Sequence, residues 1–169
     1  LAMQGAGLSE LALPAVLLAF GVGAVAGNIA GGQAADRFGA TRTVCWSLAL
    51  GAAALIVFSA IPALPHAYAG PLLVAAMVPW GVIGWAFPPA QASRLLAIAP
   101  DDAPVVLSLN GSALYLGVAL GSVVGAEVLR VGSPADLGWV GALFPLIGLA
   151  IVLGAYALRH RSVAVAPAE

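Results

Sequence analysis

Apolar residues recur along this chain in long runs that short polar segments separate. An α-helix needs about 20 apolar residues to cross the roughly 30 Å hydrocarbon core of a bilayer. The pattern therefore predicts an all-α integral membrane protein with about five transmembrane helices, in which residues 1–169 form one helical unit. The predicted spans are residues 11–33, 43–62, 71–90, 105–129 and 139–158.

The third predicted span is unusual because prolines interrupt it. Pro79, Pro88 and Pro89 all lie within residues 71–90. Proline lacks a backbone N–H donor, so inside a helix it causes a kink or a break. We therefore expect this span to be broken.

Glycines at every fourth position mark one face of two predicted helices. Small residues at this spacing let two helix backbones approach closely in a membrane. We interpret both stripes as helix-packing faces, and the alternative is a sliding or rocking contact in a transport cycle. The stripes consist of Gly23, Gly27 and Gly31 in the first span and Gly117, Gly121 and Gly125 in the fourth.

The composition agrees with a membrane protein. Hydrophobic residues make up 62% of the chain and charged residues only 8%, whereas soluble domains carry about a quarter charged residues. The net charge is -1, and the six basic residues are scattered arginines. This distribution excludes a basic surface for nucleic acid.

The residues offer no chemistry for catalysis or metal binding. Cys45 is the only cysteine, which excludes an internal disulfide and a multi-cysteine metal site. The segment 21–26 fits a dinucleotide-binding glycine pattern, but no strands alternate with helices around it. No HExxH motif is present, and the predicted spans contain neither a Ser/His arrangement nor paired aspartates of an intramembrane enzyme. We therefore expect no enzyme activity, no cofactor and no metal.

The positions of the arginines predict how the chain is oriented. Cytoplasmic loops of membrane proteins collect basic residues close to the ends of the spans. Five of the six arginines fall on one side of the membrane, and only Arg130 falls on the other. We therefore expect the loops after the first, third and fifth spans, and the C-terminal tail, to be cytoplasmic. The arginines of the first side are Arg37, Arg42, Arg94, Arg159 and Arg161.

A charged segment, GGQAADRFGATRT at residues 31–43, links the first two spans and resembles the signature loop of the major facilitator superfamily. The resemblance implies that this loop holds a cytoplasmic gate closed. In this role the Asp36 carboxylate accepts hydrogen bonds from an arginine and from the N-terminus of a neighbouring helix. Ala40 departs from the basic residue that often follows the second glycine. The family pattern corresponds to Gly32, Asp36, Arg37, Gly39 and Arg42.

A second segment, residues 93–125, is similar to the penultimate helix of bacterial drug and sugar exporters such as arabinose-efflux-type permeases. The resemblance implies that the five spans are the last five of a twelve-helix transporter in the bacterial inner membrane, and that its first seven helices are missing. It also implies proton-coupled efflux of a small organic solute, a sugar or a drug-like molecule. The expected partners are membrane lipid, the missing N-terminal half and the substrate.

The rival interpretation is a Gly-rich membrane scaffold that binds partner helices and transports nothing. A transporter fragment should need its other half, whereas a scaffold should assemble without it.

Polar and aromatic residues inside the spans are candidate substrate contacts, because polar groups in a membrane usually face a cavity or a partner helix. Ser108, Ser112 and Tyr115 recur at steps of four and three and share one helical face. Hydrogen bonding between helices is the competing role. The candidates for a substrate cavity are Asn28, Trp80, Ser108, Asn110, Ser112 and Tyr115.

Glu127 lies near the end of the fourth apolar run, and a carboxylate in a membrane can carry protons. Arg130 follows three residues later, a spacing that suits an ion pair on one helix. We expect a structural ion pair, with a proton site as the alternative.

Overall fold

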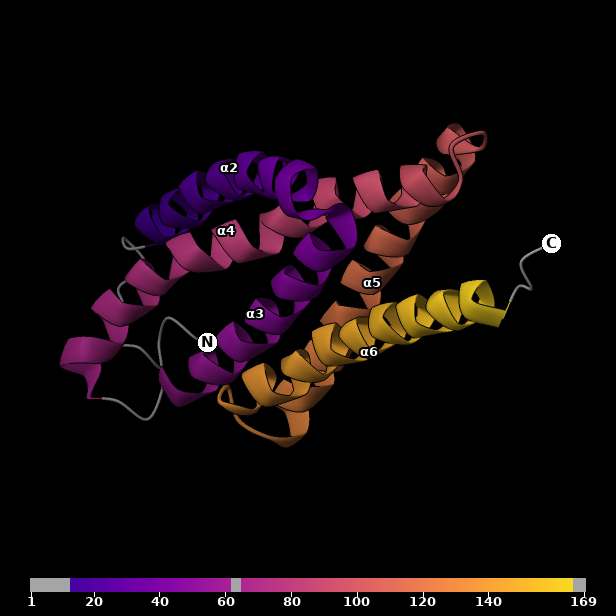
Figure 1. Cartoon of the computed structure of the whole chain (residues 1–169). Helices are drawn as coiled ribbons and strands as arrows, with labels where there is room; N and C mark the ends of the chain where they lie inside the picture. The colour runs from indigo at the N-terminus through magenta and orange to yellow at the C-terminus, as the bar shows by residue number, and fades with distance from the viewer. Residues whose placement is uncertain (1–12, 62–64, 166–169) are drawn as a thin grey trace.

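The computed structural model describes residues 13–61 and 65–165, which form helices joined by short turns (Figure 1). All five described helices are long and apolar enough to cross a membrane, and no strand occurs in these ranges. The predicted all-α membrane fold is thus confirmed. The helices are α2 (Leu13–Phe38), α3 (Ala40–Ala60), α4 (His66–Ile98), α5 (Ala103–Val131) and α6 (Asp136–Val165).

The helices extend beyond the apolar runs that predicted them. The helix α2 continues through Asp36 and Arg37, which the sequence analysis placed in a turn, and α4 continues well past residue 90. Hydropathy marks the part of a helix that lipid surrounds, whereas backbone hydrogen bonds continue into the polar ends. Residues 11, 12 and 62, which bound two predicted spans, lie outside the described residues.

The predicted break in the third span is wrong. The helix α4 runs without interruption from His66 to Ile98, with Pro71 also inside it. Each proline removes one hydrogen bond, but neighbouring helices can hold a proline-containing span together in a membrane. The close contact of α2 with Val78, Val82 and Ala86 provides such support in the middle of α4, where Pro79 lies.

The first glycine stripe forms the closest helix contact in the described structure. Gly23, Gly27 and Gly31 are all buried in α2. A Cβ on Gly27 would lie 2.7 Å from the Cα of Val82 in α4, closer than real Cβ atoms come. On the α4 side, a Cβ on Gly81 would lie 2.8 Å from the backbone nitrogen of Ala24. The packing role predicted for this stripe is therefore confirmed, and its partner is α4.

The helix α3 connects this pair of helices to α6. The buried Ser47 hydroxyl in α3 donates to the carbonyl of Ile83 in α4 at 2.6 Å. On the other side of α3, a Cβ added to Gly138 of α6 would meet the backbone and side chain of Ser59. The approach of α6 to α3 is therefore tight at Gly138, whereas Gly141 and Gly148 further along α6 make only ordinary side-chain contacts with α3.

The buried core is small and is built from small side chains. Its main cluster comprises Ala35, Val44, Ala90 and Val152. Most large apolar side chains of the described residues are exposed. This arrangement suits a protein whose solvent is lipid, because helix association in a bilayer relies on close packing rather than on burial of apolar area.

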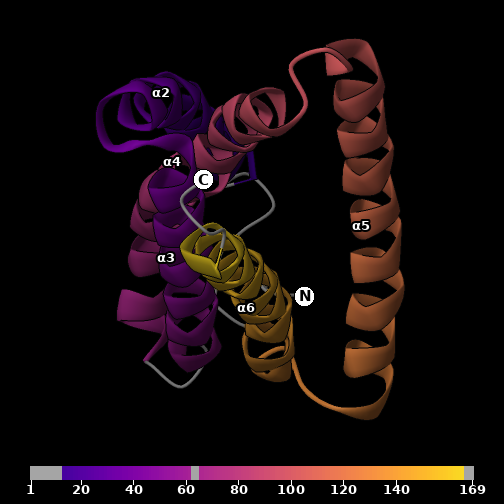
Figure 2. The ribbon, with the colours of Figure 1, turned by 45° about the vertical axis from the view of Figure 1, so that its right-hand side comes forward.

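The helix α5 stands apart from the other helices (Figure 2). None of its residues is buried. Gly117 and Gly121 have open space where a Cβ would lie, and Gly125 would only touch the end of the Leu137 side chain at 3.8 Å. Among the described residues, no helix approaches the second stripe closely, so its predicted packing role stays a prediction.

Candidate functional site

The charged segment between α2 and α3 reverses the chain at a single residue. Gly39 is the only residue between the two helices and has a φ of 92°, a conformation that glycine adopts without strain. The Gly39 N–H donates to the Ala35 carbonyl at 3.0 Å. The Gly39 carbonyl accepts from both the N–H and the hydroxyl of Thr43, each at 3.1 Å. These bonds tie the turn to both helices.

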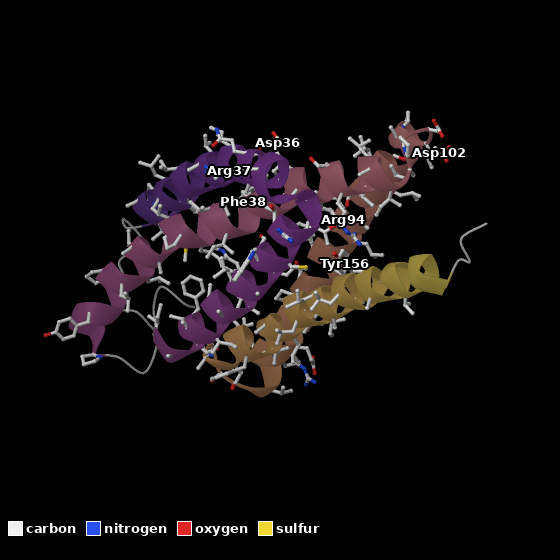
Figure 3. All side chains as sticks on the ribbon, in the orientation of Figure 1. Asp36, Arg37, Phe38, Arg94, Asp102 and Tyr156 are labelled. Atoms are coloured by element: carbon white, nitrogen blue, oxygen red, sulfur yellow. The ribbon has the colours of Figure 1, made fainter. Side chains whose placement is uncertain are left out.

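Asp36 and Arg37 lie side by side at the end of α2, and both are exposed (Figure 3). The Arg37 guanidinium lies over the ring of Phe38, 5.4 Å from its centroid. The Asp36 carboxylate has no hydrogen-bond or ion-pair partner among residues 13–61 and 65–165. The structure therefore does not place Asp36 against an arginine or against the start of α5, where Asp102 lies (Figure 3).

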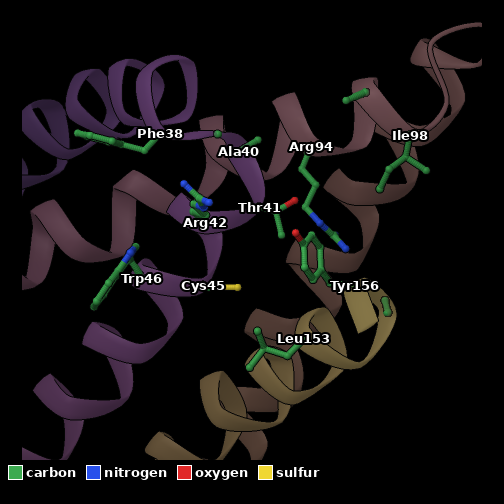
Figure 4. A pocket seen from close by; sticks show the side chains of 13 residues that line it. Phe38, Ala40, Thr41, Arg42, Cys45, Trp46, Arg94, Ile98, Leu153 and Tyr156 are labelled. Atoms are coloured by element: carbon green, nitrogen blue, oxygen red, sulfur yellow. The ribbon is translucent and has the colours of Figure 1, made fainter. Parts of the chain in front are cut away.

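Gly32 and Arg42, the remaining residues of the predicted loop, occupy different settings. Gly32 lies inside α2 with open space where a Cβ would be. Arg42 lies in the first turn of α3 and lines a cavity of about 930 Å³ at this end of the structure (Figure 4). The sequence analysis did not foresee this cavity.

The cavity combines cationic, hydroxyl and apolar groups from α3, α4 and α6, and Phe38 at the end of α2 also lines it. Arg94 reaches it from the last part of α4, and its side chain points toward Tyr156 of α6 (Figure 4). Thr41 lies beside Arg94. Trp46 and Leu153 belong to the apolar part of the lining. No described lining residue carries a carboxylate.

Arg42 and Arg94 are far apart in the sequence. Their location on the same side of the membrane could be predicted, but not that they line the same cavity. The structure brings these two to the same end of the helices, and Arg130 lies near the opposite end of α5. The side chains of Arg159 and Arg161 lie outside the described residues.

Two of the predicted cavity residues lie in other contacts. Asn28 lines a second, smaller cavity of about 410 Å³ together with Trp85. Trp80 instead packs edge-to-face on Phe58, with ring centroids 5.6 Å apart. Asn28 belongs to α2 and Trp85 to α4, so no pattern along a single helix in the sequence could predict that they line the same cavity.

The other four candidates lie on α5. The Ser108 hydroxyl donates to the Val105 carbonyl at 2.8 Å, and the Ser112 hydroxyl donates to the Ser108 carbonyl at 3.0 Å. Both hydroxyls therefore bond within their own helix rather than to another helix. Tyr115 is 76% exposed, and Asn110 is half-buried. Apart from Asn110, the polar residues of this face are exposed.

Glu127 and Arg130 form an ion pair near the end of α5. The Arg130 Nε donates to a Glu127 carboxylate oxygen at 2.8 Å, and a guanidinium NH2 group donates to the other oxygen. Both side chains are more than half exposed. Among the described residues, this is the only ion pair, and no group of three or more His, Cys, Asp or Glu side chains could hold a metal ion.

Comparison with known proteins identifies relatives that are named as transporters. The chain is 31% identical over 143 residues to an uncharacterized MFS-type transporter, YbcL, of Bacillus subtilis (strain 168). It is 34% identical over 140 residues to the inner membrane transport protein YdhP of Escherichia coli (strain K12). No family model and no solved structure matches the chain.

The matches cover most of this chain but only part of each relative. They include 85% and 83% of this chain, and 35% and 33% of the two relatives. The chain thus spans about a third of the length of the curated relatives it matches. MFS denotes the major facilitator superfamily, the family that the charged segment resembles.

Proposed function

We propose that this chain, a relative of MFS-type transporters along most of its length, is the C-terminal helical part of a secondary transporter. The proposed activity is proton-coupled efflux of a small organic solute, a sugar or a drug-like molecule, across the bacterial inner membrane. The observation that carries the proposal is the sequence similarity to YbcL across 85% of the chain, combined with five membrane-spanning helices. The multi-pass membrane character follows from the same two findings.

The charged segment is proposed as the cytoplasmic gate. Its Asp36 carboxylate is exposed and has no partner among the described residues. An exposed carboxylate next to a fixed turn can accept from a helix that another part of the transporter supplies. In this proposal the contact forms in one state of the transport cycle and breaks in the other.

The substrate is proposed to contact α5 and the region of Asn28. Polar residues follow α5 at Ser108, Ser112 and Tyr115, where none of the described helices covers them. Transporters of this architecture place the binding site between two halves that rock about it. An uncovered polar face is what one wall of such a site would present when the other half is absent.

The coupling proton is proposed to use Glu127. This carboxylate is the only acidic side chain of α5; it lies near the end of the helix and forms an ion pair with Arg130. Protonation of Glu127 would release Arg130. Replacing Glu127 with Gln should therefore abolish proton-driven transport while leaving binding of the solute intact, and unchanged coupling would remove Glu127 from the mechanism.

The experiment that tests the transport proposal uses the protein at its natural length in inside-out membrane vesicles. Addition of a transported sugar or drug should dissipate an imposed proton gradient, which a pH-sensitive dye reports. Asp36→Asn should reduce the rate at least about tenfold, if one charge-assisted contact of about 1.5–3 kcal/mol stabilises the gate. The control is Asp101→Asn, an exposed carboxylate in the turn before α5. A panel of solutes that never dissipates the gradient would reject proton-coupled efflux.

A helix-binding scaffold is the second candidate, and the uncovered glycine stripe on α5 favours it. The two functions differ in whether the chain needs the remaining helices of its own protein in order to assemble. A transporter part should co-purify with the remaining helices of its own protein, whereas a scaffold should assemble without them. Separate expression of the two parts with different affinity tags distinguishes the candidates.

A further inference from the structure

The cavity at the Gly39 end of the structure shares Gly39 and Arg42 with the proposed gate, but the transport proposal assigns no role to the rest of its lining. It lies between α3, α4 and α6, and its volume of about 930 Å³ is within the range of sites for small molecules. The candidate substrate residues Asn28, Ser108 and Tyr115 do not line it. We therefore infer the ligand of this cavity from the residues that line it.

The charge of the cavity favours an anion. Arg42 and Arg94 both line it, and no described lining residue is acidic. Neither arginine has an ion-pair partner in residues 13–61 and 65–165. Arg94 is half-buried and its side chain points toward Tyr156 (Figure 4), and Thr41 lines the same cavity. Arginine presents a planar set of donors that matches phosphate oxygens, and the Thr41 hydroxyl can add a further donor.

The apolar part of the lining favours a lipid over a soluble phosphate. Trp46 is 68% exposed, Leu153 is 51% exposed and Ile98 is also exposed. All three line the same cavity as the arginines. A free phosphate ion would leave this apolar surface in contact with water, whereas the acyl chain of a phospholipid would cover it. The cavity also lies at one end of three spans, where lipid headgroups are found.

We infer that this cavity binds an anionic phospholipid, with Arg94 and Arg42 holding the headgroup phosphate and with Trp46, Ile98 and Leu153 in contact with an acyl chain. The site requires only that the chain lies in a membrane, so it does not depend on the transport proposal. Basic pockets between membrane helices are a recurrent form of headgroup recognition.

The test is a lipid titration followed by native mass spectrometry of the natural-length protein in detergent. The ligands are dioleoyl phosphatidylglycerol, dioleoyl phosphatidylethanolamine and glycerol 3-phosphate. The first two have the same acyl chains but differ in net charge, and the third is the soluble headgroup anion. We expect saturable binding of phosphatidylglycerol, with binding of the other two at least about tenfold weaker, at roughly 1 kcal/mol or more per arginine contact.

The matched variants locate the site. Replacing both Arg42 and Arg94 with Gln should weaken phosphatidylglycerol binding about 25-fold, at about fivefold for each arginine. Arg37→Gln removes a charge from the same end of the structure but not from the cavity lining, and should change binding less than about twofold. Equal binding by wild type and double variant would overturn the proposal, as would equal affinity for the two phospholipids.

Two further readouts keep the test decisive. If the double variant does not fold, the Arg42→Lys and Arg94→Lys variants retain the charge but lose the planar donors, and should bind more weakly than wild type. In the wild type, raising the salt from about 0.05 to 0.5 M should weaken phosphatidylglycerol binding severalfold. If glycerol 3-phosphate binds as tightly as the lipid, the apolar contacts contribute nothing and the lipid assignment is wrong.

Discussion

The glycine stripes of α2 and α5 have the same spacing but opposite settings. Gly27 in α2 lies so close to α4 that a Cβ would be 2.7 Å from the Cα of Val82. By contrast, a Cβ added to Gly121 in α5 would have no neighbouring atom within 4 Å. The comparison teaches that a small-residue stripe encodes the capacity for close approach, while the presence of a complementary helix decides whether that approach occurs.

The reason for the difference lies in the partner helices. The helix α4 presents Gly81 to α2, so small residues face one another from both sides of the contact. The helix α5 meets no such surface, and none of its residues is buried in the described structure. If α5 belongs to a transporter of several further helices, as we propose, its stripe is available to them.

The largest effect is expected from a larger side chain in the packed stripe. Gly27→Val should force α2 away from α4, because the obstruction is the backbone at Val82, which cannot turn aside. Overpacking of a tight contact costs about 1–3 kcal/mol or more, so the unfolding free energy should fall by about 3 kcal/mol. Unfolding in a mixture of mild and denaturing detergents measures it. A wild-type unfolding midpoint would show that the helices are further apart in the protein than this structure places them.

The next effect should come from the turn that joins α2 to α3. Gly39→Ala places a side chain at a φ of 92° and should destabilise the protein by about 1–3 kcal/mol. The matched control is Gly132→Ala in the turn after α5, where φ is -134°. That substitution keeps an ordinary backbone angle but must displace the Asp136 carboxylate, which accepts two hydrogen bonds from Ser133, so we expect a measurable loss that is smaller than for Gly39→Ala. Equal losses in the same unfolding measurement would show that the backbone angle is not the reason for Gly39.

A smaller effect should distinguish a hydrogen bond between helices from one within a helix. Ser47→Ala removes the bond to the Ile83 carbonyl and should cost about 0.6 kcal/mol, and at most about 1.7 kcal/mol, the average and the maximum for hydrogen bonds between membrane helices. Ser112→Ala removes a bond within α5 and should cost less than about 0.5 kcal/mol. The difference between the two unfolding free energies is the test, and a larger loss for Ser112 would reverse our interpretation.

The smallest effect is expected in the open stripe. Gly121→Leu should change the unfolding free energy of the 169-residue chain by less than about 0.5 kcal/mol, because nothing lies within 4 Å. In the natural-length protein the same change should be much more harmful if further helices cover α5. The test is to measure the unfolding free energy of this variant in the 169-residue chain and in the natural-length protein. An equally small effect in both would mean that α5 faces lipid.

Much of the fold could be predicted, since the apolar runs directly reflect which segments can cross a bilayer. The interruption expected at Pro79, Pro88 and Pro89 was wrong, because a proline weakens a helix locally but adjacent helices decide whether it breaks. The turn at Gly39 was predictable from the glycine between two helices, although Asp36 and Arg37 proved to be part of α2.

The candidate site was less predictable. Pairings within one helix, such as Glu127 with Arg130, follow from the three-residue spacing. The pairs Asn28 with Trp85, Trp80 with Phe58, and Arg42 with Arg94 connect different helices, and no periodicity indicates them. Each depends on how two helices are rotated relative to one another.

The sequence by itself determined that this protein is helical and membrane-spanning, where its spans lie, and which faces of α2 and α5 are smooth enough for close packing. Only the tertiary structure decided that α2 meets α4, that α5 remains uncovered, and that two distant arginines line one cavity. The physical reason is that hydropathy and glycine spacing act along a single helix, whereas partner choice depends on the fit between two surfaces.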